Sequence, residues 1–160
     1  MKIAVMGAGG VGGYYGAALA QAGEDVTFIA RGAHLAAMRQ SGLKVESQAK
    51  GNFALASVKA TDKPADIGPV DLILMATKAY DLESASASLK PCLGPKTVIL
   101  PLLNGVDIAD RIASVVGKPY VLGGMCQISA AITAPGTIRV AGPLNKIVFG
   151  ELGGGSSPRV

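Results

Sequence analysis

The chain has 160 residues and a formal net charge of +4, with 49% apolar and 16% charged residues. This balance excludes a disordered chain. The apolar runs stop short of the roughly 18 residues that a membrane span requires. The cations are scattered and only 4% of the residues are aromatic, which argues against nucleic-acid binding. One domain with a single core fits this length, and with no signal peptide after Met1 we expect a soluble cytoplasmic protein.

The first thirty residues predict a β-α-β unit. Lys2–Met6 is a short apolar run that indicates a strand and ends at glycine. The alanine-rich segment Val11–Gln21 predicts a helix closed by Gly23, and Asp25–Ala30 predicts a second strand. This order and length are those of the first half of a nucleotide-binding fold.

The middle of the chain continues the alternation of helix and strand. A helix is expected over Ala33–Gln40, and Leu43–Ser47 and Phe53–Ala60 are expected to pair as strands. The apolar run Val70–Ala76 indicates a parallel strand buried on both faces. The later predicted elements are a helix over Tyr80–Leu89, a strand over Thr97–Leu100 and a helix over Asp107–Val116.

Beyond Pro119 the pattern predicts strands without helices. These strands cover Tyr120–Ala131, Thr137–Val140 and Lys146–Phe149, with a turn at Ala134–Gly136. The predicted fold class is therefore α/β, a Rossmann-type doubly wound and mainly parallel sheet with a few extra strands at the C-terminal end. We expect residues 1–152 to form this domain and residues 153–160 to be a linker-like tail.

The turn between the first strand and the first helix predicts a dinucleotide site. Its residues are Gly7, Ala8, Gly9, Gly10, Val11 and Gly12. Gly7 would permit the tight turn, Gly9 would let the backbone approach a pyrophosphate, and Gly12 would let the helix pack on the strand. The helix N-terminus would then stabilise the phosphates with its free amides.

The end of the second strand favours NADP(H) over NAD(H). An NAD site normally carries Asp or Glu there, but no acidic residue lies between Asp25 and Glu46. Arg31 stands at that position and can bind a 2′-phosphate, with His34 as a secondary candidate. A solvated surface arginine is the alternative interpretation.

Two polar residues after later strands indicate a second part of the same cleft. Lys78 follows the strand predicted at Val70–Ala76 and precedes the next predicted helix. A cation at a helix N-terminus is unfavourable because it opposes the helix dipole, so Lys78 at this position suggests a compensating ligand. Asn104 follows the strand beginning at Thr97 and can both donate and accept hydrogen bonds. A turn asparagine and an idle lysine are the alternative.

The only cysteines, Cys92 and Cys126, lack metal-ligand spacing, so we expect reduced, buried thiols and no metal.

Together these motifs resemble ketopantoate reductase, also called 2-dehydropantoate 2-reductase. The resemblance rests on Gly7–Gly12, Ala30–Gly32, Thr77–Ala79 and Leu103–Gly105 and spans nearly the whole chain. It implies NADPH as cofactor and reduction of ketopantoate to pantoate, on the route to pantothenate and coenzyme A. It also implies that Lys78 and Asn104 line the nicotinamide side, with Asn104 within reach of the substrate.

The resemblance further implies that catalysis needs a second domain. In the family, a helical substrate domain follows and supplies the proton-donating lysine, so we expect no catalytic residue within this chain and little activity from it alone. Apolar surface left where that domain would pack would favour self-association into a homodimer. Three alternatives stay open: a reductase of another 2-oxo acid, a stand-alone NADP-binding sensor, and an NAD-linked dehydrogenase half. Arg31 disfavours the NAD-linked dehydrogenase.

Overall fold

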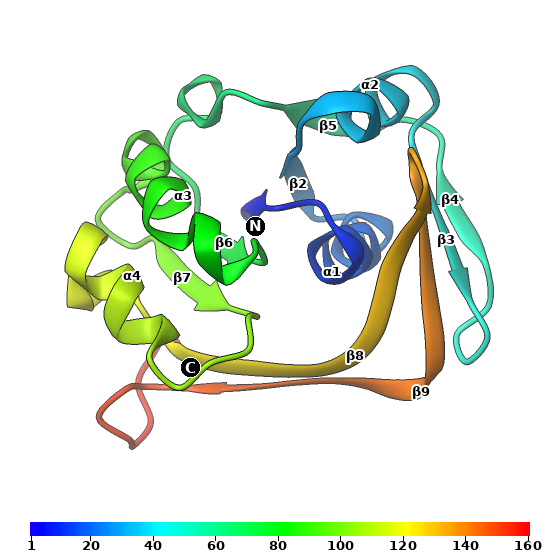
Figure 1. Cartoon of the computed structure of the whole chain (residues 1–160). Coiled ribbons are helices and arrows are strands. Elements are labelled where there is room, and N and C mark those ends of the chain that lie inside the picture. The colour runs from blue at the N-terminus through cyan, green and yellow to red at the C-terminus, as the bar shows by residue number, and fades with distance from the viewer.

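A computed structural model describes residues 1–160 and places two sheets around the first helix (Figure 1). The strands are β1 (Lys2–Met6), β2 (Asp25–Ile29), β3 (Leu43–Ser47), β4 (Phe53–Leu55), β5 (Lys59–Thr61), β6 (Leu72–Met75), β7 (Val98–Pro101), β8 (Gly123–Ala134) and β9 (Thr137–Gly150). The α-helices are α1 (Gly10–Gln21), α2 (Gly32–Ser41), α3 (Leu82–Ser88) and α4 (Ile108–Val116). Four single-turn 3₁₀ segments cover Pro64–Asp66, Ala79–Asp81, Lys90–Cys92 and Lys118–Tyr120.

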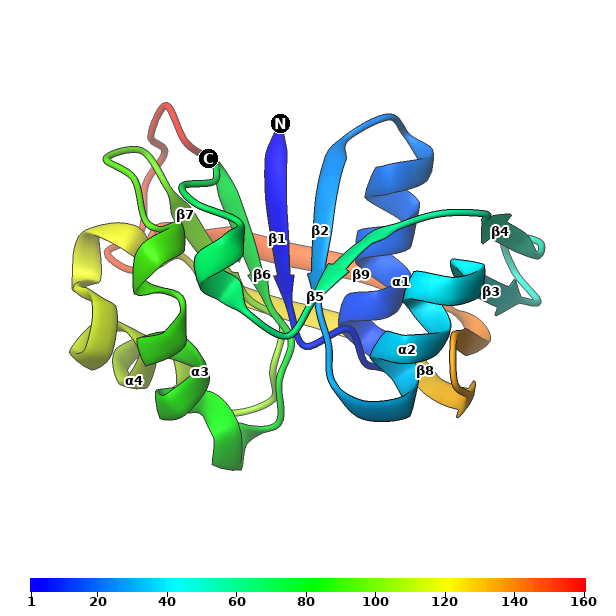
Figure 2. The same cartoon turned by 90° about the horizontal axis from the view of Figure 1, so that it is seen from above.

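The central sheet has five parallel strands in the order β5-β2-β1-β6-β7. The chain therefore runs outward from β1 to one edge, then returns to β6 and continues to the other edge. Helices lie on both faces, with α1 and α2 on one side and α3 and α4 on the other (Figure 2). This confirms the predicted doubly wound, Rossmann-type sheet, whose direction of winding reverses beside β1.

Alternating side chains of the central strands form two separate cores. Ile3 and Val5 belong to the core shared with α1, whereas Ala4 and Met6 belong to the core shared with α3 and α4. All four are buried, which explains why the strand has no polar alternation in its sequence. The apolar run predicted as a strand at Val70–Ala76 contains β6 and is buried in the same two-sided way.

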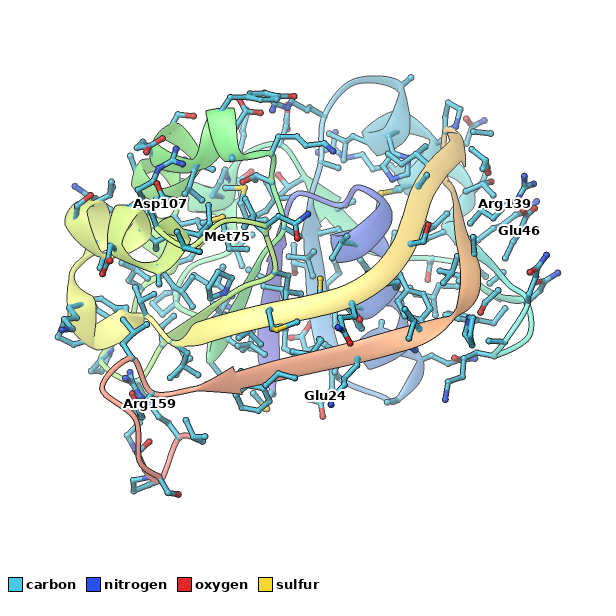
Figure 3. The ribbon with its side chains drawn as sticks, turned by 60° about the horizontal axis from the view of Figure 1, so that its bottom comes forward. Glu24, Glu46, Met75, Asp107, Arg139 and Arg159 are labelled. Atoms are coloured by element: carbon cyan, nitrogen blue, oxygen red, sulfur yellow. The ribbon has the colours of Figure 1, made fainter.

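A second sheet, of order β4-β3-β9-β8, covers the outer side of α1. The long β8–β9 hairpin curves around the helix (Figures 1 and 3), and a Cβ at Gly13 of α1 would lie 2.9 Å from Ile138 of β9. Arg139 of β9 forms a 2.8 Å ion pair with Glu46 of β3, and Figure 3 shows the two side chains next to each other. The extra C-terminal strands thus build their own sheet rather than extend the first one.

Three of the predicted strands were wrong in detail. Phe53–Ala60 is not one strand, because only β4 pairs with β3 while β5 crosses to the open edge of β2. Thr137–Val140 and Lys146–Phe149 are not separate strands, because β8 continues opposite both and pairing resumes after an irregularity at residues 142–144. Gly142 there adopts φ +73°, which together with Pro143 accounts for the break in the sequence pattern.

The remaining differences are small. The helix predicted from Tyr80 begins at Leu82, after the 3₁₀ turn Ala79–Asp81. At the C-terminal end, Arg159 forms ion-pair contacts with Glu151 and also donates to the carbonyl of Pro119. None of the helices combines the length and the hydropathy that a membrane crossing requires.

Candidate cofactor cleft

The turn from β1 into α1 is held in one conformation by close backbone packing. Gly7 has φ +94°, and a Cβ there would lie 2.8 Å from the carbonyl oxygen of Ala76. The amides of Gly7 and Ala8 both donate to the carbonyl of Ile29 at 3.2 Å. The chain therefore turns sharply at the C-terminal end of β1, between the ends of β2 and β6.

The first amides of α1 have no protein acceptor. The first helical hydrogen bond runs from the amide of Gly13 to the carbonyl of Gly9 at 2.7 Å, which leaves the four amides of Gly9–Gly12 without a partner. A Cβ at Gly10 or Gly12 would lie 2.2 Å from a backbone oxygen, of Ala130 and Gly7 respectively. At Gly9, by contrast, no atom lies within 4 Å of that position. An anion can therefore approach the helix end at Gly9, as the phosphates of a dinucleotide would require.

A cleft of about 410 Å³ opens at this helix end. It lies at the C-terminal edge of the parallel sheet, beside the point where the winding reverses. Its lining comprises Met6, Gly7, Ala8, Gly9, Ile29, Ala30, Arg31, His34, Asp62, Pro64, Thr77, Asp81, Ser84, Ala85, Ser88 and Ile132. The structure thus brings Arg31 and the start of the glycine turn into one cleft.

Arg31 lies at the end of β2 and reaches across the cleft. Its Nη2 atom is 2.5 Å from Oδ2 of Asp81, and its side chain is 82% exposed. Asp62, after β5, also lines the cleft and forms a 3.6 Å ion pair with Arg39. Two carboxylates therefore lie in the cleft although none follows β2 in the sequence.

His34 joins the cleft to the hairpin. Its Nδ1 accepts a 3.0 Å hydrogen bond from the amide of Gly136, in the turn between β8 and β9, whereas its Nε2 is buried without a hydrogen-bond partner. Burial lowers the pKa of His34, and the backbone of Ala8 opposes this in part. The imidazole is therefore neutral at pH 7 and fixes the hairpin turn against α2.

Lys78 and Asn104 lie at the same edge of the sheet but outside the lining of this cleft. They follow β6 and β7, which are paired neighbours. Both side chains are exposed and neither forms an ion pair or hydrogen bond within the chain. Tyr80 and Val106, on the same two loops, are also exposed, the first by 82% and the second fully.

Several lining residues were missed by reasoning from the sequence. Thr77 adjoins Lys78 and could have been found with it, but Ser84 and Ser88 project from α3 and resemble ordinary helix residues. Ile132 comes from β8, more than a hundred residues after the glycine turn. Only the folding of the hairpin over α1 brings it to the cleft.

The cysteines are free, with Cys92 buried and Cys126 half-buried.

A parallel sheet that reverses its winding at a glycine turn with unpaired helix amides defines a Rossmann-type domain, the class of fold that binds dinucleotides at such a turn. Residues 3–154 match the model of the family described as "Ketopantoate reductase PanE/ApbA". The chain therefore belongs to the ketopantoate reductase family, whose members are oxidoreductases.

Individual relatives agree with this assignment. The chain is 34% identical to a 2-dehydropantoate 2-reductase of Mesorhizobium japonicum, over 100% of its own length and 55% of that protein. It also superimposes on the crystal structure of 2-dehydropantoate 2-reductase from Porphyromonas gingivalis with a TM-score of 0.81 and 45% identity, covering 93% of this chain and 53% of that one. The chain spans about half the length of the relatives it matches.

A third neighbour has a different substrate. The ternary structure of D-mandelate dehydrogenase with NADH and anilino(oxo)acetate matches with a TM-score of 0.79 and 28% identity, covering 89% of this chain and 46% of that one. Proteins similar to this chain therefore include one that has been seen with NADH.

Proposed function

We propose that this chain is the NADP(H)-binding half of a reductase that converts 2-dehydropantoate to pantoate. The observation that carries the proposal is the open face at Gly9, the first of four unpartnered amides, which lines the same cleft as Arg31. In this proposal the amides of Gly9–Gly12 bind the pyrophosphate and Arg31 binds the 2′-phosphate of the adenosine.

The nicotinamide side of the site would be formed by Lys78 and Asn104. When bound, the reduced nicotinamide supplies a hydride to the ketone carbon of the substrate. Lys78 supplies positive charge beside the cofactor, and the amide of Asn104 can donate a hydrogen bond to a substrate oxygen. Neither residue has a competing partner within the chain, which leaves both available for these contacts.

The proton for the product alkoxide would come from outside residues 1–160. We assign no general acid within the chain and place it in a helical substrate domain, as in the family that the chain resembles. The exposed Tyr80 and Val106 support this arrangement, because they are apolar side chains on the loops that carry Lys78 and Asn104. For the 160-residue chain without that domain, a homodimer that covers this surface stays a prediction. The cytoplasmic location is likewise a prediction.

A second candidate is a reductase of another 2-oxo acid. The similarity to D-mandelate dehydrogenase with anilino(oxo)acetate favours it, because there a comparable domain serves a different substrate. A binding module that senses NADP(H) without catalysis would share the cleft but make no use of Lys78 and Asn104. Replacing Lys78 by Glu and Asn104 by Asp would weaken nicotinamide binding only if these side chains face the cofactor.

Titration of the chain with NADPH and NADH, followed by nucleotide fluorescence, tests the cofactor assignment. We expect NADPH to bind more tightly, and Arg31→Ala to weaken NADPH binding about 10-fold or more while leaving NADH binding nearly unchanged. Arg139→Ala is the matched control, because it breaks the 2.8 Å ion pair with Glu46 and neither of these residues lines the cleft. Tighter binding of NADH than of NADPH would overturn the Arg31 argument. The chain alone should turn over 2-dehydropantoate slowly or not at all.

A further inference from the structure

An ion pair crosses the cofactor cleft and is not used by the proposed reaction. It joins Arg31 to Asp81, with 2.5 Å between the guanidinium nitrogen and the carboxylate oxygen. Arg31 follows β2 and Asp81 follows β6, and these are the strands on either side of β1. The pair therefore links the two loops that flank the Gly7–Gly12 turn, and Arg31 and Asp81 both line the cleft.

The two partners differ in how firmly they are held. Asp81 sits where the 3₁₀ turn meets α3; its amide donates to the carbonyl of Lys78 and its own carbonyl accepts from the hydroxyl of Ser84. Its side chain is 30% exposed, whereas that of Arg31 is 82% exposed and has no other partner. The carboxylate is thus the fixed member, and the long arginine side chain is the one that can move.

We propose that Asp81 is a specificity-determining positioning residue, which holds Arg31 at the cleft in the place of the 2′-phosphate. The inference rests on the proposed function. For NADP(H) to use Arg31, the guanidinium must exchange the carboxylate for the phosphate, which carries more charge and more acceptor oxygens. With NADH the pair can stay intact, and Asp81 offers an acceptor for a ribose hydroxyl. Asp81 therefore reduces the preference of this cleft for NADP(H) over NAD(H).

The size of the effect follows from the exposure of the pair. Ion pairs between exposed side chains are weak, so releasing Arg31 should lower NADPH affinity by only about two- to fivefold. Removing the charge of Asp81 should therefore raise NADPH affinity by the same factor. This gain should require Arg31, because the carboxylate acts only by pairing with the Arg31 side chain.

The test is a double-mutant cycle on the 160-residue chain. Dissociation constants for NADPH, NADH and adenosine 2′,5′-bisphosphate are measured for the wild type, Asp81→Asn, Arg31→Ala and the double variant. We expect Asp81→Asn to bind NADPH and the bisphosphate about two- to fivefold more tightly, with no gain for NADH and no gain in the Arg31→Ala background. Glu83→Gln is the matched control: it makes the same charge change and breaks a 2.7 Å ion pair with Arg111, outside the cleft lining.

The outcomes separate the inference from the proposed function. Retained NADPH preference without tighter NADPH binding by Asp81→Asn overturns the inference alone. An equal gain in the Arg31→Ala background also overturns it, because Asp81 would then act on the phosphate directly. If the wild type shows no NADPH preference and Arg31→Ala changes neither affinity, both the proposed function and the inference fail. Thermal unfolding of each variant establishes that the comparison is made between folded proteins.

Discussion

Replacing Gly9 by alanine should separate cofactor binding from folding. Gly9 has φ −71° and ψ −161°, a conformation that alanine adopts without strain, and its added Cβ would meet no atom within 4 Å. The free energy of unfolding should therefore stay the same or rise by up to about 1 kcal/mol, because alanine has fewer unfolded conformations than glycine. The methyl group would, however, stand where the proposed function places a phosphate beside the unpartnered amides.

The loss of binding can be estimated from the contacts at risk. A hydrogen bond to a charged group contributes about 1.5–3 kcal/mol, so losing one amide–phosphate contact should weaken NADPH binding by about 10- to 100-fold. The assay is fluorescence titration with NADPH, together with urea denaturation of the same variant. NADH binding should fall by a similar factor, because both dinucleotides carry the pyrophosphate.

Gly10→Ala is the matched comparison in the same turn. Its Cβ would lie 2.2 Å from the carbonyl oxygen of Ala130, so the β8–β9 hairpin would have to move away from α1. We expect a loss of about 1–3 kcal/mol in unfolding free energy. If Gly9→Ala kept its NADPH affinity within threefold, or lost as much stability as Gly10→Ala, the assignment of the open glycine to phosphate binding would be refuted.

Three further predictions concern stability. Tyr15→Phe should raise the unfolding free energy by about 1 kcal/mol in urea denaturation, because the Tyr15 hydroxyl is buried without a partner and burial raises its pKa to about 12; a clear loss would reveal a missing partner. Thr97→Val should cost about 1–3 kcal/mol in the same assay, since the hydroxyl donates to Val70 and accepts from the amide of Gly94; an unchanged midpoint would contradict this. Burial lowers the pKa of His34 in the folded state below its value in the unfolded chain. The free energy of unfolding should therefore be constant with respect to His34 above about pH 6.5, and should decrease as the pH falls from there toward the folded pKa, because the unfolded chain then binds the proton more readily. Unfolding measured at pH 7.5 and 5.5 should show this loss in the wild type and a smaller one in His34→Gln.

The sequence determined the parts of this protein that depend on near neighbours. The strand, glycine turn and helix from Lys2 to Gln21 could be predicted because local conformation dictates them: apolar residues buried on both faces, glycine where φ is positive, and an alanine-rich helix. Arg31 could be placed in the cleft because strand ends in a parallel sheet share an edge.

Pairing between distant segments could not be predicted from the sequence. Lys59–Thr61 has no feature that distinguishes the edge of β2 from the edge of β3 as its partner, because a short strand is stabilised by whichever edge the fold leaves open. The same holds for the β8–β9 hairpin, which covers α1, brings Ile132 to the cleft and lets the amide of Gly136 donate to His34.

The charged side chains of the cleft could likewise be predicted only in part from the sequence. The sequence lacks an acid after β2, and from that alone Arg31 has no competitor for a phosphate. The fold places Asp81, fifty residues further along, 2.5 Å from Arg31, because β6 returns to the other side of β1. Electrostatic interactions act through space and depend on which strands become neighbours. The glycine turn and the nearby cation Arg31 could therefore be predicted from the sequence, whereas the anion that pairs with Arg31 depends on the order of the strands in the sheet.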